Sequence, residues 1–427
     1  MSTGTGSLRA GGLTPLSSIT ASPDPQDAYQ RLRAAYGTVA PVELEPGVNA
    51  WLVMGWKEIC DVVRRDRVFS HDPNNWRDLR EGNVAPDSGL GPMMFPRPNA
   101  YCTDGPDHHR LRVPLDDGIR GLDQRRFRRA VSRMCADLIA DFAGRGEADL
   151  VAEYAAAIPM LAVASLFGLD VARGHELQRA IVSLFTATEE SASGNRALER
   201  ILTECLQSHR QAPTDDMTTV FLDHPNLRDD AEIMQSMLLM VGAGYETTTA
   251  WIAQALQLML TDPRFRGRVG SWRPGVDDAL DQVLWGEPPM ANMPARYALS
   301  DTELAGQPIQ RGDAIILGLM AAGSDPGVHV ADSWTELGNR SHLAWSTGPH
   351  ACPAQVPARI ITRTAVDTAL SLLPGMKLAV PAEQLTVRPS PWTRCPLTLP
   401  VRFTPFTPQS APGSAPPTRE LTPYGGQ

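Results

Sequence analysis

One cysteine stands in a setting that suits metal ligation. Cys352 ends the run Gly-Pro-His-Ala-Cys at residues 348–352, and a helical pattern begins shortly after it. Free backbone N–H groups and the helix dipole at a helix start favour a thiolate, the form of cysteine that binds metals. Pro353 has no N–H to donate to the sulfur, which predicts a more electron-rich thiolate.

Cys352 also suits two alternative roles, one in the core and one at a zinc site. A single cysteine near a helix is often a small core residue, and the spacing of His350 and Cys352 would suit zinc, although no further ligands are evident nearby. Covalent attachment of a c-type haem needs Cys-x-x-Cys-His, which is absent. The six cysteines are widely spread, which argues against a disulfide framework and for a reducing compartment.

A long helical pattern lies upstream of the cysteine. Asp229 and Asp230 suit its N-cap and Pro263 ends it, so a single helix of about 45 Å would cross the protein. Its centre, residues 242–249, is Gly-Ala-Gly-Tyr-Glu-Thr-Thr-Thr. Each glycine costs the helix on the order of 1 kcal/mol relative to alanine, and small residues at such a place often let another helix pack closely.

The neighbours of these glycines favour a chemical role instead. Thr247 can donate its hydroxyl hydrogen to the carbonyl of Ala243 and bend the helix, which would open a groove for a flat ligand or dioxygen. Glu246 then brings a proton-carrying group to the side of that groove. The sequence therefore predicts an acid and an alcohol beside a ligand site.

The remaining patterns predict a mainly α protein with minor β structure. Strand patterns occur at residues 50–54, 385–388 and 397–403. Helical patterns occur at residues 57–65, 125–145, 150–167, 174–186, 197–208, 230–260, 276–285 and 359–373. Composition predicts a flexible N-terminal arm at 1–23, a single folded domain at 24–403 and a disordered tail rich in Pro, Ser and Gly at 404–427.

The amino-acid composition limits the classes of partner that the protein is expected to bind. The 427 residues are 42% hydrophobic and 20% charged, with a formal net charge of -9. An acidic balance argues against a mainly phosphate-binding surface, so nucleic acid is not expected. The N-terminus carries no signal-peptide pattern and no apolar run long enough for a bilayer, so we expect a cytoplasmic protein without a membrane segment.

Taken together, the two motifs resemble the cytochrome P450 family in its soluble bacterial form. Ala-Gly-Tyr-Glu-Thr-Thr at 243–248 and Gly-x-His-x-Cys at 348–352 occur in the family's order and at its separation, and the resemblance covers residues 25 to 403. The segment 104–112 is similar to the stretch in which a His and an Arg four residues later bind the haem propionates, here His108 and Arg112. Arg296 and His350 would be further propionate contacts.

The resemblance implies the cytochrome P450 fold, with the long central helix over a heme b whose iron Cys352 ligates. Glu246 and Thr247 would deliver protons. The cofactor-binding residues implied are His108, Arg112, Ala243, Gly244, Arg296, Gly348, His350 and Cys352. The implied reaction inserts one oxygen atom from O2 into a small hydrophobic organic substrate. Electrons would come from NAD(P)H through ferredoxin reductase and a ferredoxin, which would dock on basic residues such as Arg110, Arg359 and Arg363.

The sequence also departs from the family pattern. Gln282 and Trp285 occupy the positions of a Glu-x-x-Arg ion pair that normally braces the structure behind the haem, as in an actinobacterial subgroup lacking this motif. The third member, an Arg near Ser333 and Trp334, is also missing, and Ser346 replaces a glycine of the cysteine loop. Haem binding would survive this loss, but turnover is less secure. The alternative is therefore a haem-binding sensor or interaction protein without turnover.

Overall fold

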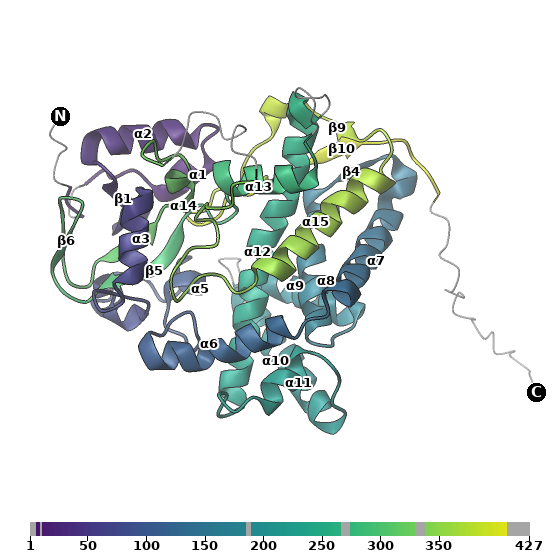
Figure 1. Cartoon of the computed structure of the whole chain (residues 1–427), viewed down its shortest axis with the longest axis horizontal. Helices are drawn as coiled ribbons and strands as arrows, with labels where there is room; N and C mark the ends of the chain where they lie inside the picture. The colour runs from purple at the N-terminus through teal and green to yellow at the C-terminus, as the bar shows by residue number, and fades with distance from the viewer. Residues whose placement is uncertain (1–5, 9–10, 185–188, 266–273, 329–337, 408–427) are drawn as a thin grey trace, which may run out of the picture.

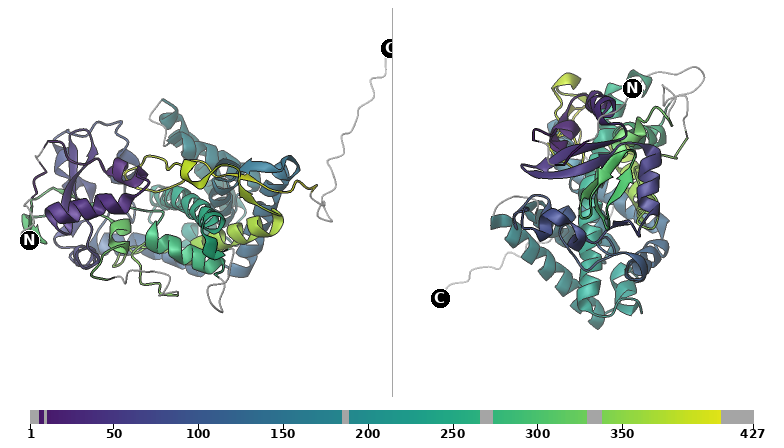
Figure 2. Two further views of the ribbon diagram at one scale, coloured as in Figure 1. Left: turned by 90° about the horizontal axis from the view of Figure 1, so that it is seen from above. Right: turned by 90° about the vertical axis from the view of Figure 1, so that its left-hand side faces the viewer.

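The computed structural model describes residues 6–8, 11–184, 189–265, 274–328 and 338–407. A strand-rich part, which contains the N-terminal segments, lies beside a larger helical part (Figure 1). Perpendicular views show that the helical part holds a bundle of helices around one long central helix (Figure 2). The predicted mainly α architecture with a minor sheet is confirmed.

The strand-rich part is built on a five-stranded sheet. Its order is β1 (Val39–Glu45), β2 (Val48–Val53), β8 (Ala314–Leu317), β5 (Met293–Ala298) and β3 (Phe69–Ser70). β2 and β8 pair in parallel, and the other pairs are antiparallel. All four residues of β8 are buried, as expected for an apolar strand covered on both faces. The sheet therefore gives β5, which carries Arg296, a fixed position next to the helical part.

The N-terminal segment packs against this sheet. α1 (Leu16–Ala21) buries Leu16 and Ile19, while α2 (Pro25–Tyr36) and α3 (Trp56–Arg64) follow. The prediction of a flexible arm is thus wrong for Leu16–Ala21, because burial of these two apolar side chains and a hydrogen bond from Arg394 to the carbonyl of Thr20 hold the helix against the rest of the fold.

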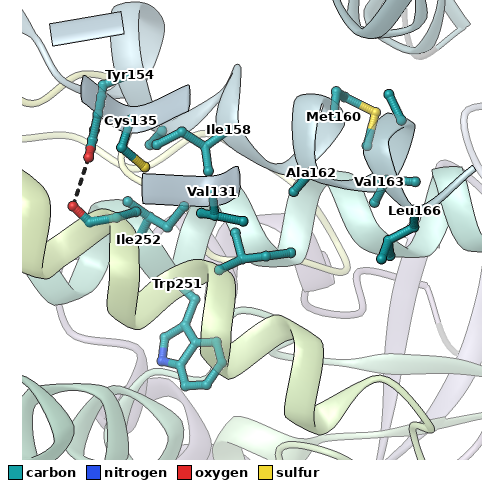
Figure 3. Close-up of a cluster of buried hydrophobic side chains, with 14 of the residues drawn as sticks. Val131, Cys135, Tyr154, Ile158, Met160, Ala162, Val163, Leu166, Trp251 and Ile252 are labelled. Atoms are coloured by element: carbon teal, nitrogen blue, oxygen red, sulfur yellow. Dashed lines mark hydrogen bonds between the residues drawn. The ribbon is translucent and has the colours of Figure 1, made fainter. Parts of the chain in front are cut away.

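The helical part is organised around α12 (Asp230–Thr261), whose N-cap is Asp229 as predicted. α7 (Gln124–Phe142), α8 (Ile158–Leu166), α13 (Val276–Gly286) and α15 (Gln355–Leu372) complete its core. In Figure 3, Tyr154 and its neighbours pack beside Trp251 and Ile252, two buried residues of α12. The Tyr154 hydroxyl donates a hydrogen bond of 2.8 Å to the carbonyl of Ala365 on α15. This packing holds α12 and α15, and with them both predicted motifs, in one rigid core.

The remaining elements surround these two parts. They are α4 (Arg77–Arg80), α5 (Gly91–Met94), α6 (Gly105–Arg120), α9 (Val171–Leu184), α10 (Glu189–Gln211), α11 (Met217–Asp223), α14 (Leu319–Gly323), β4 (Glu147–Asp149), β6 (Thr302–Leu304), β7 (Gln307–Ile309), β9 (Lys377–Leu378) and β10 (Pro400–Arg402). No helix within the described ranges is both long and apolar enough to cross a membrane.

Several predicted elements differ from the observed ones. Residues 150–167 form a π-helical turn, Val151–Ala155, before α8 instead of one helix. Residues 385–388 contribute only an isolated bridge from Val387 to Pro396. The sequence pattern does not predict α6, because Gly105, Pro106 and Pro114 obscure its helical period. The predicted tail starts too early, since the backbone of Phe406 still donates a hydrogen bond to Ala143, and residues 408–427 lie outside the described ranges.

Candidate active site

The loop before α15 has a backbone that presents Cys352 in a fixed way. The N–H of Cys352 donates to the carbonyl of Trp345 at 2.9 Å, and the N–H of Ala351 donates to Gly348 at 3.0 Å. Gly348 has a φ of 76°, and a Cβ there would lie 2.9 Å from the carbonyl oxygen of Val63. Ser346 also has a positive φ, 56°, although it is not glycine. The loop thus depends on two left-handed residues, of which only one is a glycine.

Cys352 is half-buried, and its surroundings have opposing effects on the pKa of its thiol. Burial raises its pKa, whereas a hydrogen bond from the backbone of Ala354 and the charge of Arg112 lower it, with the net shift upward. α15 begins only at Gln355, so the effect of the helix start is smaller than the sequence predicted. Iron would remove the thiol proton on binding, because only the thiolate is a good ligand.

Three imidazoles stack beside this loop. The ring of His350 lies 3.4 Å from that of His71 and 3.8 Å from that of His108, measured between centroids. Burial lowers the pKa of all three, and that of His350 falls to about 2. The neighbouring charge of Arg296 acts in the same direction on His71 and His350. Burial therefore favours neutral imidazoles in this stack, although the Asp104 carboxylate lies 3.9 Å from Nε2 of His350.

Two arginines complete this cluster. Arg296 on β5 is 3% exposed, and its Nη1 lies 3.2 Å from Nδ1 of His71, while burial lowers its pKa to about 10. Arg112 on α6 donates to the carbonyl of Ala351 at 2.8 Å and to Asp116. These side chains line a pocket of about 300 Å³.

The structure thus brings the four predicted propionate-binding residues, His108, Arg112, Arg296 and His350, to one pocket. His71 also lines this pocket, together with three carboxylates, and is not among the predicted residues. It follows the short strand β3 and has no motif of its own, so only its contacts in the fold reveal it.

The centre of α12 has the predicted kink-forming contact. The hydroxyl of Thr247 donates to the carbonyl of Ala243 at 3.0 Å, so this hydrogen bond is confirmed. Ala243 is exposed although it lies midway along a central helix, and a Cβ added at Gly242 would meet no atom within 4 Å. An added Cβ at Gly244 would lie 3.1 Å from Val163. One side of α12 therefore borders open space at this point, while the other is packed.

The Glu246 carboxylate is held by the C-terminal segment. It accepts a hydrogen bond of 2.7 Å from the hydroxyl of Thr393, and the guanidinium of Arg388 lies 3.7 Å away. The side chain is 26% exposed, so solvent reaches the carboxylate. The chain thus places Glu246 between the surface and the Thr247 turn of the helix.

The region behind the cysteine loop carries ion pairs that the sequence pattern does not predict. Asp281, the residue before Gln282, pairs with Arg340 and Arg359. Trp285 donates from its indole nitrogen to the carbonyl of Asn339 at 2.7 Å. The expectation that this region has lost its ionic brace therefore needs correction, because a carboxylate with two arginines occupies it. The predicted position of the third member, Ser333 to Trp334, lies outside the described ranges.

The arginines expected to dock a ferredoxin already have partners within the chain. Arg110 makes two hydrogen bonds to Glu232, at 2.7 and 2.8 Å. Arg359 pairs with Asp281, and Arg363 lies 3.2 Å from Asp277. A docking protein would have to compete with these internal pairs.

Comparison with known proteins places the chain in a family. No family model matches it. It is 29% identical over 378 residues to a biflaviolin synthase of Streptomyces coelicolor, covering 85% of this chain and 90% of that protein. It is 26% identical over 366 residues to a 2-hydroxy-5-methyl-1-naphthoate 7-hydroxylase of Streptomyces carzinostaticus, covering 82% and 88%. A myxobacterial cytochrome P450 solved with myristic acid superposes with a TM-score of 0.79 at 25% identity, covering 91% of this chain and 98% of that one.

The chain belongs to the cytochrome P450 family. The predicted cytochrome P450 fold is therefore confirmed, with α12 as its long central helix. Like the hydroxylases and oxygenases it resembles, this cytochrome P450 is a monooxygenase, and its cofactor is haem iron.

The residues of this region fit a haem. Nε2 of His71 and Nε2 of His108 are buried without a hydrogen-bond partner within the described ranges, and both face the Arg296 pocket. Buried donors of this kind suit the propionate carboxylates. Trp345 of the cysteine loop meets Trp251 edge-to-face at 5.3 Å, about one turn beyond Thr247. Cys352 and the open side of α12 therefore belong to the same region of the protein.

A buried histidine lies behind the loop. His342 is 7% exposed, and neither ring nitrogen has a hydrogen-bond partner within the described ranges. Its ring meets that of Trp285 edge-on at 5.5 Å. Burial lowers its pKa from 6.5 to about 4, so it is neutral at pH 7.

We predict that Ser346→Gly stabilises the protein. The substitution relieves a left-handed φ and removes a buried hydroxyl that has no partner within the described ranges. The expected gain in free energy of unfolding is about 1 kcal/mol, measured by urea denaturation. Gly348→Ala is the opposing control, since it adds a Cβ against Val63, and equal responses of the two variants would show that backbone strain at these positions does not limit stability.

We predict that His342 makes the protein less stable in acid. Its folded pKa of about 4 is below the unfolded value of 6.5, so the unfolded chain binds the proton first and stability falls between those pH values. His342→Phe should remove about 3 kcal/mol of this pH dependence. Urea unfolding at pH 7 and pH 4.5 measures it, with exposed His109→Asn as control. If the free energy of unfolding of His342→Phe falls between pH 7 and pH 4.5 by as much as that of the wild type, His342 does not cause the loss of stability in acid.

Proposed function

We propose that this cytochrome P450 inserts one oxygen atom from O2 into a small, hydrophobic organic substrate, with electrons that pass from NAD(P)H through a ferredoxin. The observation that carries the proposal is the meeting of Cys352, the Thr247 turn of α12 and the pocket of arginines and imidazoles in one region. The names of the relatives support small organic substrates, since one acts on a naphthoate and a solved relative holds myristic acid.

Each group has a role within this proposal. Cys352 ligates the iron, and the pocket of His71, His108, Arg112, Arg296 and His350 holds the propionates. Haem with a thiolate ligand supplies the activation of dioxygen. The small side chain of Ala243 leaves the open side of α12 accessible to the flat ring, while Gly244 and Gly348 permit close packing against Val163 and Val63 and so keep α12 and the loop in position.

The protons that the reaction consumes have a route on this chain. Glu246 exchanges protons with solvent, and Arg388 with Thr393 holds its carboxylate beside the next residue, Thr247. The Thr247 hydroxyl already donates to Ala243, so its oxygen is free to accept a hydrogen bond from a water at the open side of α12. Glu246 therefore acts as the acid and Thr247 as the alcohol that positions the proton donor.

We predict a thiolate-type absorption band for the reduced, CO-treated protein. Cys352→Ser should lose this band, because an alcohol does not provide thiolate ligation. Cys60→Ala, at a buried cysteine on α3, serves as the control and should keep the band. A wild-type protein without the band, or a Cys352→Ser variant that retains it, would overturn the proposal.

We predict that Thr247→Ala separates electron use from product formation. With a ferredoxin, its reductase and a panel of hydrophobic substrates, NAD(P)H consumption should continue while product formation falls on the order of 100-fold, since the positioned alcohol is lost. Thr247→Ser keeps the hydroxyl and should retain most of the product yield. Equal product yields from the Ala and Ser variants would show that the Thr247 hydroxyl has no such role. A wild-type protein that never forms product would favour the alternative function, a haem-binding sensor without turnover.

A further inference from the structure

Asp281 on α13 is a buried carboxylate that binds two arginines. It is 6% exposed, and its Oδ2 accepts a hydrogen bond of 3.0 Å from Nε of Arg340. Its Oδ1 accepts a second hydrogen bond from Arg359. A buried carboxylate without partners would be strongly unfavourable, so these two guanidiniums stabilise Asp281 in its buried position.

The two arginines come from opposite sides of Cys352 in the sequence. Arg340 belongs to the segment that leads into the cysteine loop, and Arg359 lies in α15, which leads away from it. α13 and α15 both pack against α12 (Figure 1). The Asp281 carboxylate on α13 thus binds an arginine on each side of Cys352, the proposed iron ligand.

Aromatic side chains make further contacts around each of the two ion pairs of Asp281. The guanidinium of Arg359 lies 5.6 Å from the ring centroid of Trp251, which in turn meets Trp345 of the cysteine loop. The indole nitrogen of Trp251 donates to the carbonyl of Leu280, the neighbour of Asp281. The other end is held by Trp285, which donates to Asn339, the residue before Arg340. The charged and aromatic contacts therefore form one connected structure.

We propose that Asp281, acting through Arg340 and Arg359, is the positioning residue that fixes the Cys352 loop for thiolate ligation, in the region where the family's ion pair is absent. The proposal rests on the proposed function, because it concerns the same iron ligand. Arg359 is the stronger link, since its side chain is 22% exposed whereas that of Arg340 is 58% exposed, and exposed ion pairs contribute little.

The chain offers a matched control one turn away. Asp277 lies on the same helix and also contacts Arg359, at 3.5 Å, and Arg363, at 3.2 Å. Its side chain is 40% exposed, so water screens these pairs. Asp277→Asn therefore removes a carboxylate from the same helix and the same arginine without uncovering a buried charge.

The test compares Asp281→Asn, Asp281→Glu and Asp277→Asn as full-length, haem-loaded proteins. The readouts are the fraction of total haem that gives the thiolate-type band with CO, and the rate of haem transfer to an acceptor protein. Asp281→Asn should speed haem loss about 10- to 100-fold and lower the thiolate fraction, as expected for a residue that supports a metal ligand. Asp277→Asn should match the wild type, and Asp281→Glu should recover most of the thiolate fraction. Equal behaviour of Asp281→Asn and Asp277→Asn would overturn the proposal.

A second pair of variants covers the case in which Asp281→Asn does not fold. Arg359→Gln removes the buried partner and Arg340→Gln the exposed one, so the thiolate fraction should fall more in Arg359→Gln. The reverse order would overturn the proposal. A wild-type protein without a thiolate band would count against the proposed function instead, so the two failures are distinguishable.

Discussion

Burial of charge around the cysteine loop is the constraint on which the site depends. Arg296 is almost fully buried, and desolvation lowers its pKa to about 10 even with Asp104 and Tyr101 nearby to stabilise the cation. Its guanidinium lies beside the imidazole of His71, and the Asp104 carboxylate lines the same pocket. The sheet fixes β5 and therefore Arg296, so this charge cannot move to solvent. A dianionic group in the pocket would add a further counter-charge, so propionate binding would stabilise cations that the fold already holds in place.

Behind the Cys352 loop, buried charge is stabilised in a different way. There the protein provides its own anion, Asp281, and surrounds it with two guanidiniums and tryptophan rings. The pocket in front of the loop combines two arginines with three carboxylates and four imidazoles, whereas behind the loop one buried carboxylate meets two arginines.

The sequence pattern alone predicts the local features of the site, whereas the long-range grouping of His108, Arg112, Arg296 and His350 follows only from the family resemblance. The hydrogen bond from Thr247 to Ala243 joins residues four apart on one helix, so the helical period alone predicts it. His71, by contrast, joins His350 across a large separation in the chain, and no spacing rule signals it. The sequence does not predict α6, because its glycine and proline residues are typical of turns and its tertiary packing is not visible in the local pattern. The sequence does not predict α1 either, because the stability of this short helix comes from burial of Leu16 and Ile19.

The interpretation of the missing ion pair shows why position alone is a weak guide. Counting along the motif assigns the brace to Gln282 and Trp285, neither of which carries charge, and suggests that the region has lost its support. A helix turns by about 100° per residue, so the residue before Gln282 faces a different neighbour from the one the motif predicts. In the folded protein that neighbour is the pair of arginines flanking Cys352. Support for an iron ligand is thus a property of where charges meet in space, and a chain can keep it after the residues of the familiar motif have changed.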